Sequence, residues 1–490
     1  MRSNASGIGT RIAVRSASRW TLTDTFRRHS SPGQSLQPVT VGLGGADQAD
    51  FVAVTWSDGV YQTELGLEAG RLHQITETQR QLSSCPVLFA WDGERYVFVS
   101  DLLGVGGMGY FVEPGVYAPP RPWENFLLPA GLPRALDGRY QLKIGEPMEE
   151  AAYLDSVQLV AWDLPPGWDL VLDERMAILG PEPTGEAVFY REQQLPLRAL
   201  DSHGVDVTAA VSQVDLQAPG VGELDRRFIG RLQSSQVLTL EFDDPLEKPG
   251  ASPVLVIDGW VEYPYSQTMF AAWQAAAEYR APTLQARGAD GKWHTLLEQF
   301  GYPAGMPRRM SVPLTGLPEG ADALRMITNQ EIYWDRIAVV YSEPVPAAVR
   351  RELPLSDAEV QVSGFARRTT GPQRQPHYDY DRRSPLWDTR HMRGFYTDFG
   401  PAVELLGVTD DAVAIIGPGE EVHLEFEDTL PPLQPGWQRR FVLESRGWAK
   451  DMDLYTEHGD TLEPLPASGR PAARREALHE RYNRRYRSGI

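Results

Sequence analysis

The chain contains one cysteine, Cys85, among 490 residues. A single thiol cannot form an internal disulfide or a four-cysteine zinc site, so a disulfide framework is excluded. No apolar run approaches the ~20 residues that span a bilayer, which excludes a membrane-spanning helix. Basic residues are also outnumbered, at 47 Lys and Arg against 66 Asp and Glu, for a net charge of −19. Because nucleic-acid backbones require a basic surface, nucleic acid is not expected as the main partner.

Known catalytic motifs are missing as well. The sequence has no HExxH, GxSxG, Walker A or CxxC pattern, each of which arranges a metal, nucleophile or phosphate site. No catalytic residue, metal ligand or cofactor is therefore predicted. A carbohydrate hydrolase stays open, since two carboxylates suffice for glycoside cleavage and their spacing is invisible in sequence.

Short alternating runs separated by glycine and proline dominate the chain. Val52, Val54 and Trp56 share one face of such a run, and Asp92-Gly93 joins two runs as a tight hairpin turn. This pattern predicts a mostly β protein built from several antiparallel sandwiches of jelly-roll or Ig-like type. Two short helices are expected, over 268–279 and within 472–486.

A weak repeat links two parts of the sequence. Residues 238–244 lead through a proline-rich turn to 254–260, and 422–428 lead similarly to 441–448, each ending in Gly-Trp. We interpret both as similar hairpins of one scaffold, with a true duplication as the alternative. Residues 364–393, rich in Arg, Asp and Tyr, are expected to form a long ordered loop or an insertion.

The first 82 residues resemble the ASPIC/UnbV domain. The resemblance rests on Ser3–Val14 with its Gly-Ile-Gly turn, on Thr40–Ala46, and on Val52–Gly59. The remainder resembles the region that follows this domain in large bacterial proteins with FG-GAP/VCBS propellers, through 85–104, 327–339 and 447–465. The resemblance, which includes animal cartilage-acidic-protein-like proteins, implies binding or adhesion. The chain departs from the pattern because the propeller and its calcium loops are missing.

Residues 236–341 also resemble a galactose-binding-like jelly roll. Together these resemblances suggest five regions: an ASPIC/UnbV-like domain (1–82), a β-rich domain (83–220), the jelly roll (236–343), a second β-rich domain (344–469) and a basic tail (470–490). The family suggests an extracytoplasmic location, although no secretory signal is present in this chain.

Ligand-binding candidates come from the jelly-roll-like segment. Tyr263 and Tyr265 alternate around Pro264, and flat rings of this kind stack on sugars, while Arg325 and Asn329 supply polar contacts. Filling of the core is the competing interpretation. Asp388 and His391 are interpreted as part of a surface loop, in preference to a proton shuttle, and Cys85 as a buried inert thiol. The arginine-rich tail is interpreted as a solvated helix or as a segment that docks on an acidic surface.

The function predicted from the sequence is non-catalytic recognition or adhesion, with a carbohydrate or a protein as the partner. The alternatives are a structural scaffold for a separately encoded FG-GAP propeller protein and a carbohydrate-active hydrolase.

Overall fold

The computed structural model describes residues 4–26, 36–57, 61–77, 85–384, 391–467 and 472–489. The protein is mostly β, as predicted, with several antiparallel sheets and short helices. In the described residues the α-helices are α1 (Ser266–Gln274), α2 (Val403–Leu406) and α3 (Ala472–Tyr482), and two 3₁₀ turns are η1 (Gly104–Gly106) and η2 (Thr208–Val211). None of the helices in these ranges is long and apolar enough to cross a membrane.

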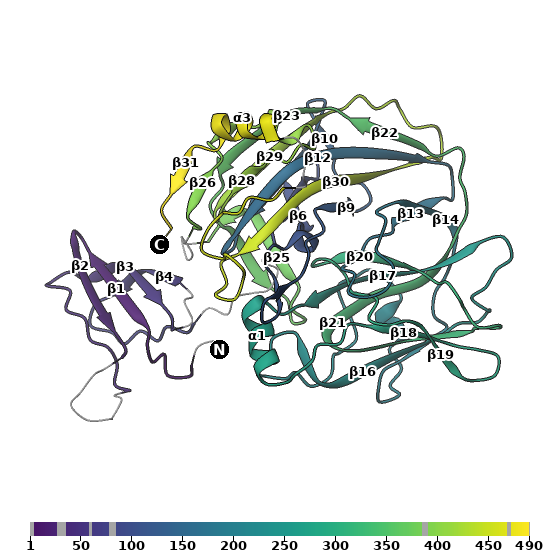
Figure 1. Cartoon of the computed structure of the whole chain (residues 1–490), viewed down its shortest axis with the longest axis horizontal. Helices are drawn as coiled ribbons and strands as arrows, with labels where there is room; N and C mark the ends of the chain where they lie inside the picture. Colours follow the sequence, from purple (N-terminus) through teal and green to yellow (C-terminus); the bar gives the residue numbers. More distant parts are fainter. Residues whose placement is uncertain are drawn as a thin grey trace.

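The N-terminal domain contains one four-stranded sheet of order β2-β1-β3-β4, which Figure 1 shows beside the rest of the molecule. Its strands are β1 (Arg11–Ser16), β2 (Arg19–Asp24), β3 (Gln48–Thr55) and β4 (Tyr61–Glu68). Val14, Val52, Val54 and Trp56 bury one face of this sheet, as the alternation in the sequence predicts.

Sandwich one packs a long sheet on a short sheet. The long sheet has the order β24-β25-β6-β5-β11-β29-β23-β27: β24 (Ala366–Thr370), β25 (Pro376–Arg383), β6 (Tyr96–Asp101), β5 (Val87–Trp91), β11 (Arg139–Glu146), β29 (Glu420–Glu427), β23 (Leu355–Val362) and β27 (Gly400–Pro401), with β10 (Ala135–Leu136) on β11. The short sheet has the order β22-β12-β30-β9: β22 (Val349–Leu353), β12 (Glu150–Leu164), β30 (Gln438–Asp451) and β9 (Trp123–Leu127), with β28 (Ala414–Ile416) on β12. Inward side chains such as Leu88, Leu142, Leu159 and Leu443 form one core between the sheets.

Sandwich two contains nine strands, and the long strand β21 belongs to both of its layers. One layer has the order β19-β18-β21-β16-β15: β19 (Trp293–Leu297), β18 (Thr283–Arg287), β21 (Ala323–Ser342), β16 (Arg231–Glu241) and β15 (Arg198–Leu200). The other layer has the order β13-β14-β21-β17-β20: β13 (Asp169–Leu172), β14 (Ala187–Gln194), β17 (Ser252–Glu262) and β20 (Arg308–Pro313) around the second half of β21. Two small ladders complete the strands: β7 (Phe111–Glu113) with β8 (Val116–Tyr117), and β26 (Gly394–Tyr396) with β31 (Arg485–Arg487).

The sheets combine distant parts of the chain. Regions 83–220 and 344–469, which the sequence suggests as two β-rich domains, both contribute strands to each sheet of sandwich one. For example, β11 pairs with β29, and β12 pairs with β30 along fourteen register positions. Sandwich two extends from β13 to β21, and its strands β13, β14 and β15 lie within region 83–220.

The two sandwiches have the same strand order. The order β6-β5-β11-β29-β23 corresponds to β19-β18-β21-β16-β15, and β22-β12-β30-β9 corresponds to β14-β21-β17-β20. Corresponding strands also follow one another in the same order along two stretches of the chain, 87–262 and 283–451. Each sandwich therefore takes half of its strands from each stretch, and the weak repeat in the sequence is one part of a full duplication.

This result corrects the hairpin interpretation. Strands β16 and β17 do not pair with each other, and neither do β29 and β30, because each chain segment crosses from one layer to the other. The Gly-Trp pairs close both crossings in the same way. A Cβ atom on Gly259 or Gly447 would lie 2.4 or 2.5 Å from the carbonyl oxygen of Tyr333 or Tyr153, so only glycine fits.

A buried aspartate marks the same position in each sandwich. Asp155 and Asp335 both follow a Tyr-x pair and bulge out of their strands. Asp155 accepts the N–H groups of Asp410 and Asp411 at 3.0 and 2.8 Å, whereas Asp335 accepts those of Asp215 and Gln217 at 3.3 Å. Each donating loop follows a one-turn helix and contains a left-handed residue, Asp411 (φ 65°) or Leu216 (φ 63°).

Candidate functional site

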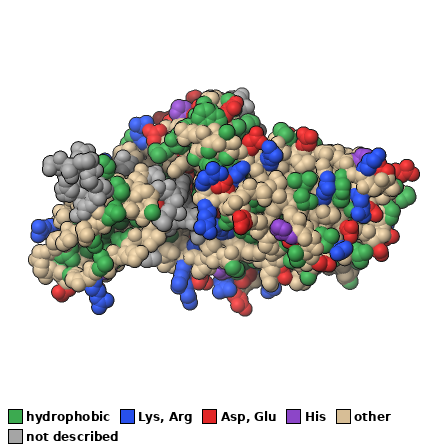
Figure 2. Space-filling view, turned by 90° about the horizontal axis from the view of Figure 1, so that it is seen from below, with side chains coloured by type: hydrophobic (Ala, Val, Ile, Leu, Met, Phe, Trp, Pro, Cys, Tyr) green, Lys and Arg blue, Asp and Glu red, His purple; other side chains and the backbone are tan. Residues whose placement is uncertain are grey.

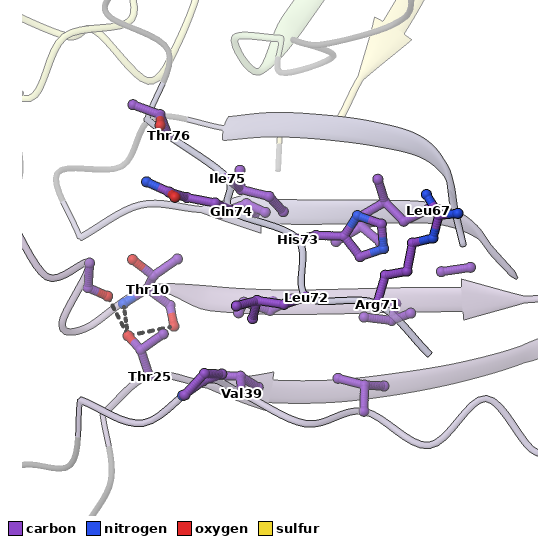
Figure 3. A pocket seen from close by; sticks show the side chains of 18 of the residues that line it. Thr10, Thr25, Val39, Leu67, Arg71, Leu72, His73, Gln74, Ile75 and Thr76 are labelled. Atoms are coloured by element: carbon purple, nitrogen blue, oxygen red, sulfur yellow. Dashed lines mark hydrogen bonds between the residues drawn. The ribbon is translucent and has the colours of Figure 1, made fainter. Parts of the chain in front are cut away.

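A groove crosses one face of the N-terminal sheet. Its volume is about 860 Å³, and Figure 3 shows the segment 71–76 passing over the strands that form its floor. Side chains lining it are mainly apolar: Ile12, Val41, Leu43, Leu67, Leu72 and Ile75. The polar groups at its end bond within the domain; the N–H of Thr10 donates to Thr25 at 2.9 Å, for instance. The groove therefore offers burial of apolar surface, and its lining also includes four ionisable residues, Glu68, Arg71, His73 and Glu77.

The opposite face of the same sheet exposes large apolar side chains. Trp20, Leu22 and Leu65 are 52%, 78% and 50% exposed, and the strand register places Phe51 beside Leu65. In the strand register Arg15 lies opposite Trp20 on β2 and opposite Phe51 on β3, and its guanidinium lies 6.0 Å from the Phe51 ring. We call Trp20, Leu22, Phe51 and Leu65 the outer face. A soluble domain rarely exposes such a contiguous set without a partner.

Ionisable groups lie buried where the two sandwiches meet. Arg308 pairs with Glu124, and its guanidinium lies 4.4 Å from the Phe126 ring. Arg121 pairs with Glu174, and burial raises the pKa of Glu174 to about 7 despite this arginine. These pairs are enclosed and join the sandwiches. Across the described ranges, no group of three or more His, Cys, Asp or Glu side chains is arranged to hold a metal ion.

The predicted tyrosines lie in this interior. Tyr265 is 1% exposed, and the Tyr263 hydroxyl lies 3.2 Å from the sulfur of Cys85. Burial raises the pKa of the Cys85 thiol well above its usual range, which agrees with an inert thiol. Tyr263 is half-buried, and both rings line a cavity of only about 50 Å³, because the segment after β17 runs between the sandwiches before entering α1. The alternation of Tyr263 and Tyr265 around Pro264 in the sequence does not indicate that these side chains lie in the interior.

The two predicted polar residues are separated from these tyrosines and from each other. The Asn329 side chain bonds the main chain on both sides, accepting from the N–H of Arg280 at 2.7 Å and donating to the Glu278 carbonyl at 2.9 Å. Arg325 lies on the outer surface of sandwich two, where its guanidinium covers the Trp293 ring at 4.4 Å and its Nε donates to Gln285. The four predicted residues are not brought together into one site.

Arg325 has a counterpart in sandwich one. The register pairs Leu324 with Ala286 and Leu240, and Leu142 with Ala90 and Leu424, so Arg325 corresponds to Lys143. Lys143 lies among aromatic and amide side chains on the outward side of the long sheet, and its Nζ lies 4.8 and 5.0 Å from the rings of Tyr96 and Tyr380. The sequence signal for this surface is the alternation of aromatic residues at Phe89, Trp91, Tyr96 and Phe98, which by itself predicts only a hairpin.

The remaining candidates have structural partners. Burial and the nearby arginines Arg487 and Arg485 lower the pKa of His391 to about 4, whereas Asp388 lies outside the described residues. The basic tail docks on the protein's own acidic surface: Arg485 and Arg487 pair with the buried carboxylate of Glu420, and Arg484 pairs with Asp398. Strand β31 of this tail pairs with β26 in a two-stranded sheet.

The comparisons with known proteins concern the N-terminal domain. No curated protein matches the chain. Residues 1–82 match the family model described as ASPIC and UnbV, the range predicted from the sequence. This family suggests a non-catalytic or accessory module, and the FG-GAP/VCBS and galactose-binding-like resemblances stay predictions. The protein is thus a mostly β chain with an N-terminal domain similar to ASPIC and UnbV.

Proposed function

We propose that this protein is a non-catalytic recognition module whose N-terminal domain docks a partner protein through its outer face. The observation that carries the proposal is the exposure of Trp20, Leu22 and Leu65 on a single-layered sheet. Covering these side chains would remove apolar surface from water, at about 25 cal/mol per Å² buried. The groove on the other face offers a second apolar surface to the same partner. Figure 2 shows hydrophobic side chains on the surface of this domain, at the left of the view.

Charge indicates the kind of partner. Residues 1–82 contain eight arginines against seven acidic residues, whereas the whole chain has 47 basic and 66 acidic residues. Arg11 and Arg15 flank the outer face, where Arg15 lies between Trp20 and Phe51 in the register. A complementary partner surface is apolar at its centre and carries carboxylates at its rim. The family resemblance suggests a separately encoded propeller protein as one such partner. This chain would then act as its scaffold and would bind it through the same face.

The hydrolase alternative has less support. Glu421 and Glu425 are the acidic residues that face outward together from one strand, β29, beside aromatic rings. Four positions along a strand separate their Cα atoms by about 13 Å, beyond the roughly 5–9.5 Å between the carboxyl groups of glycosidases. Both carboxylates also accept hydrogen bonds from neighbouring side chains, Glu421 from Lys143 at 2.7 Å and Glu425 from Gln141 at 3.2 Å.

The test combines capture with a defined binding measurement. Proximity labelling in native cells identifies candidate partners, and each candidate is then purified and titrated against the full-length protein. Leu22→Asp places a carboxylate on the outer face at a position that is 78% exposed and does not need to pack. We expect it to weaken binding at least tenfold, equivalent to about 1.4 kcal/mol, and added salt to weaken binding of the wild type.

The matched control is Leu454→Asp, which introduces the same charge at a 72% exposed leucine of the body. It should bind the partner like the wild type. Equal binding by Leu22→Asp and the wild type, or no candidate that binds after purification, would overturn the proposal.

A further inference from the structure

We infer that the outward side of the long sheet of sandwich one is a binding site for a neutral oligosaccharide. The site is formed by the rings of Trp91, Tyr96 and Tyr380, together with the amides of Gln141 and Gln361 and the carboxylate of Glu425. It lies outside the N-terminal domain, on a different sheet, and does not depend on the docking proposed above.

The rings form a continuous aromatic surface. Tyr96 lies 5.3 Å from Trp91 and 5.1 Å from Tyr380 between ring centroids. Phe89, which is 2% exposed, supports Tyr380 from below at 5.0 Å, whereas Trp91, Tyr96 and Tyr380 themselves are half-buried and reach the surface. Sugar rings present apolar C–H faces that pack on such surfaces, with polar side chains fixing their orientation.

Hydrogen bonds hold the polar side chains in fixed positions. Gln141 accepts the hydroxyl of Tyr96 at 2.5 Å and donates to Glu425 at 3.2 Å. Gln361 donates to Glu421 at 2.6 Å, and Tyr380 donates to the same carboxylate at 2.8 Å. Burial raises the pKa of Tyr96 to about 12 and that of Tyr380 further, so both hydroxyls stay neutral. A site whose side chains are already ordered loses little conformational entropy when it binds.

Strand β25 shapes this surface. In a flat sheet, Tyr380 on β25 and Glu421 on β29 would be separated by four strand spacings, about 19 Å. Their side chains are nevertheless in hydrogen-bond contact. The sheet therefore curls so that β25 folds over its outward side, and a concave surface results. Concave surfaces bury more of a ligand than flat ones.

The hairpin that makes this surface concave is an insertion. Strands β24 and β25 lie between β23 and α2, whereas β15 and η2, their counterparts in sandwich two, are joined by a short turn. In sandwich two, Gln285 replaces Phe89 and Thr239 replaces His423 at the corresponding register positions, so that its surface lacks a continuous set of rings. The duplication therefore supplies a comparison within one molecule: the same sheet with and without the added hairpin and its tyrosines.

Charge restricts the ligand class. The ammonium of Lys143 is neutralised by Glu421 at 2.7 Å, and the guanidinium of Arg139 is paired with Glu425. Arg383 lies over the Tyr380 ring at 4.5 Å and adds one positive charge, which the two exposed carboxylates of Asp357 and Glu359 on neighbouring β23 outnumber. Uronic or sulfated saccharides are repelled by such a surface, which leaves neutral sugars as the class that fits.

The test is calorimetric titration of the full-length protein with neutral oligosaccharides. The probes are four- to six-unit oligomers of glucose, galactose, mannose and xylose, with oligogalacturonate as the acidic comparison. We expect at least one neutral oligomer to bind and the acidic one not to bind. Trp91→Ala should weaken binding about tenfold, since an aromatic contact contributes about 1.5 kcal/mol beyond buried area. Trp91→Phe, which keeps a ring, should retain most of the affinity and shows that loss in Trp91→Ala is not misfolding.

Two control variants make the result specific. Trp293→Ala removes the aromatic ring on the equivalent surface of sandwich two and should bind as the wild type does. Leu22→Asp alters the docking face and should also bind saccharide normally, so that failure of one proposal is distinguishable from failure of the other. No binding by any neutral oligomer at millimolar concentration, tighter binding of the acidic oligomer, or equal loss in Trp91→Ala and Trp293→Ala would overturn the inference.

Discussion

The buried aspartate of each sandwich allows a test of what the duplicated loops require. Asp155 is fully buried, and replacing it with alanine leaves the N–H groups of Asp410 and Asp411 without their acceptor. An orphaned buried donor costs about 1–3 kcal/mol, so two cost roughly 2–6 kcal/mol. Arg446, whose Nε lies 3.2 Å from the same carboxylate, also loses its partner. We therefore expect Asp155→Ala to lower the free energy of unfolding by about 4 kcal/mol or more.

Two further variants separate the role of the oxygen from that of the charge. Burial raises the pKa of Asp155 and of Asp335 although both accept main-chain N–H groups, so burial offsets part of the stabilisation that the negative charge gains from these bonds. The accepting oxygen is then the stabilising feature, and Asp155→Asn, which keeps it, should cost less than half as much as Asp155→Ala. Asp335→Ala should lie between them, because its bonds are longer, at 3.3 Å, and no salt bridge is formed there.

Urea unfolding followed by tryptophan fluorescence measures these differences, and hydrogen exchange of residues 409–412 reports the loop directly. Asp243→Ala, at an exposed position before the turn after β16, provides the control. Unfolding of Asp155→Ala at the same urea concentration as Asp243→Ala, or a cost for Asp155→Asn equal to that of Asp155→Ala, would refute the reasoning.

Two other predictions concern buried titratable groups. Burial and the neighbouring carboxylate of Glu331 raise the pKa of Glu262 to about 7. Because the native state then binds more protons than the unfolded chain between pH ~4.3 and ~7, stability falls as the pH rises through this window, by at most about 4 kcal/mol. Glu262→Gln should remove this loss and unfold at higher urea than the wild type above pH ~7, whereas exposed Glu319→Gln should not; an unchanged pH slope in Glu262→Gln contradicts the assignment. Cys85 should resist a disulfide exchange reagent in the native protein and react once the protein is unfolded in urea, because its thiol is buried and its pKa is raised; stoichiometric reaction of the native protein within minutes would contradict this.

The sequence predicts local structure well here. The alternation in β3, the Asp92-Gly93 hairpin and the positions of α1 and α3 follow from residue patterns that act over a few positions. The pairing of strands is different, because nothing local states that β11 will pair with β29 nearly 300 residues later. For the same reason the sequence showed the repeat only as two similar fragments, and the division into regions did not anticipate strands shared between distant parts of the chain.

Prediction of the candidate site was limited for the same reason, because local patterns do not show which distant segments pack together. Tyr263 and Tyr265 have the composition of a sugar-binding loop, but their exposure depends on η1 and residues 449–456, which pack against them from elsewhere in the chain. The prediction of Arg325 rests on its position near the last strands. Its correspondence with Lys143 follows only from the register of the two corresponding sheets. The alternating aromatics of β5 and β6 were present in the sequence, but the curl that gathers them around Tyr380 requires β25.

The exchange of halves between the two stretches 87–262 and 283–451 has a consequence for how the molecule assembles. Sandwich two can close as soon as β21 is made. In sandwich one β5 already pairs with β6 and β11, but β11 and β12 wait for β29 and β30 from the far end of the body. During synthesis β11 and β12 therefore each present an open strand edge for the time needed to translate more than 200 further residues. A lone stretch with this strand content would meet the same need from a second copy of itself, so an intertwined pair of shorter chains is a natural ancestor of the present single chain.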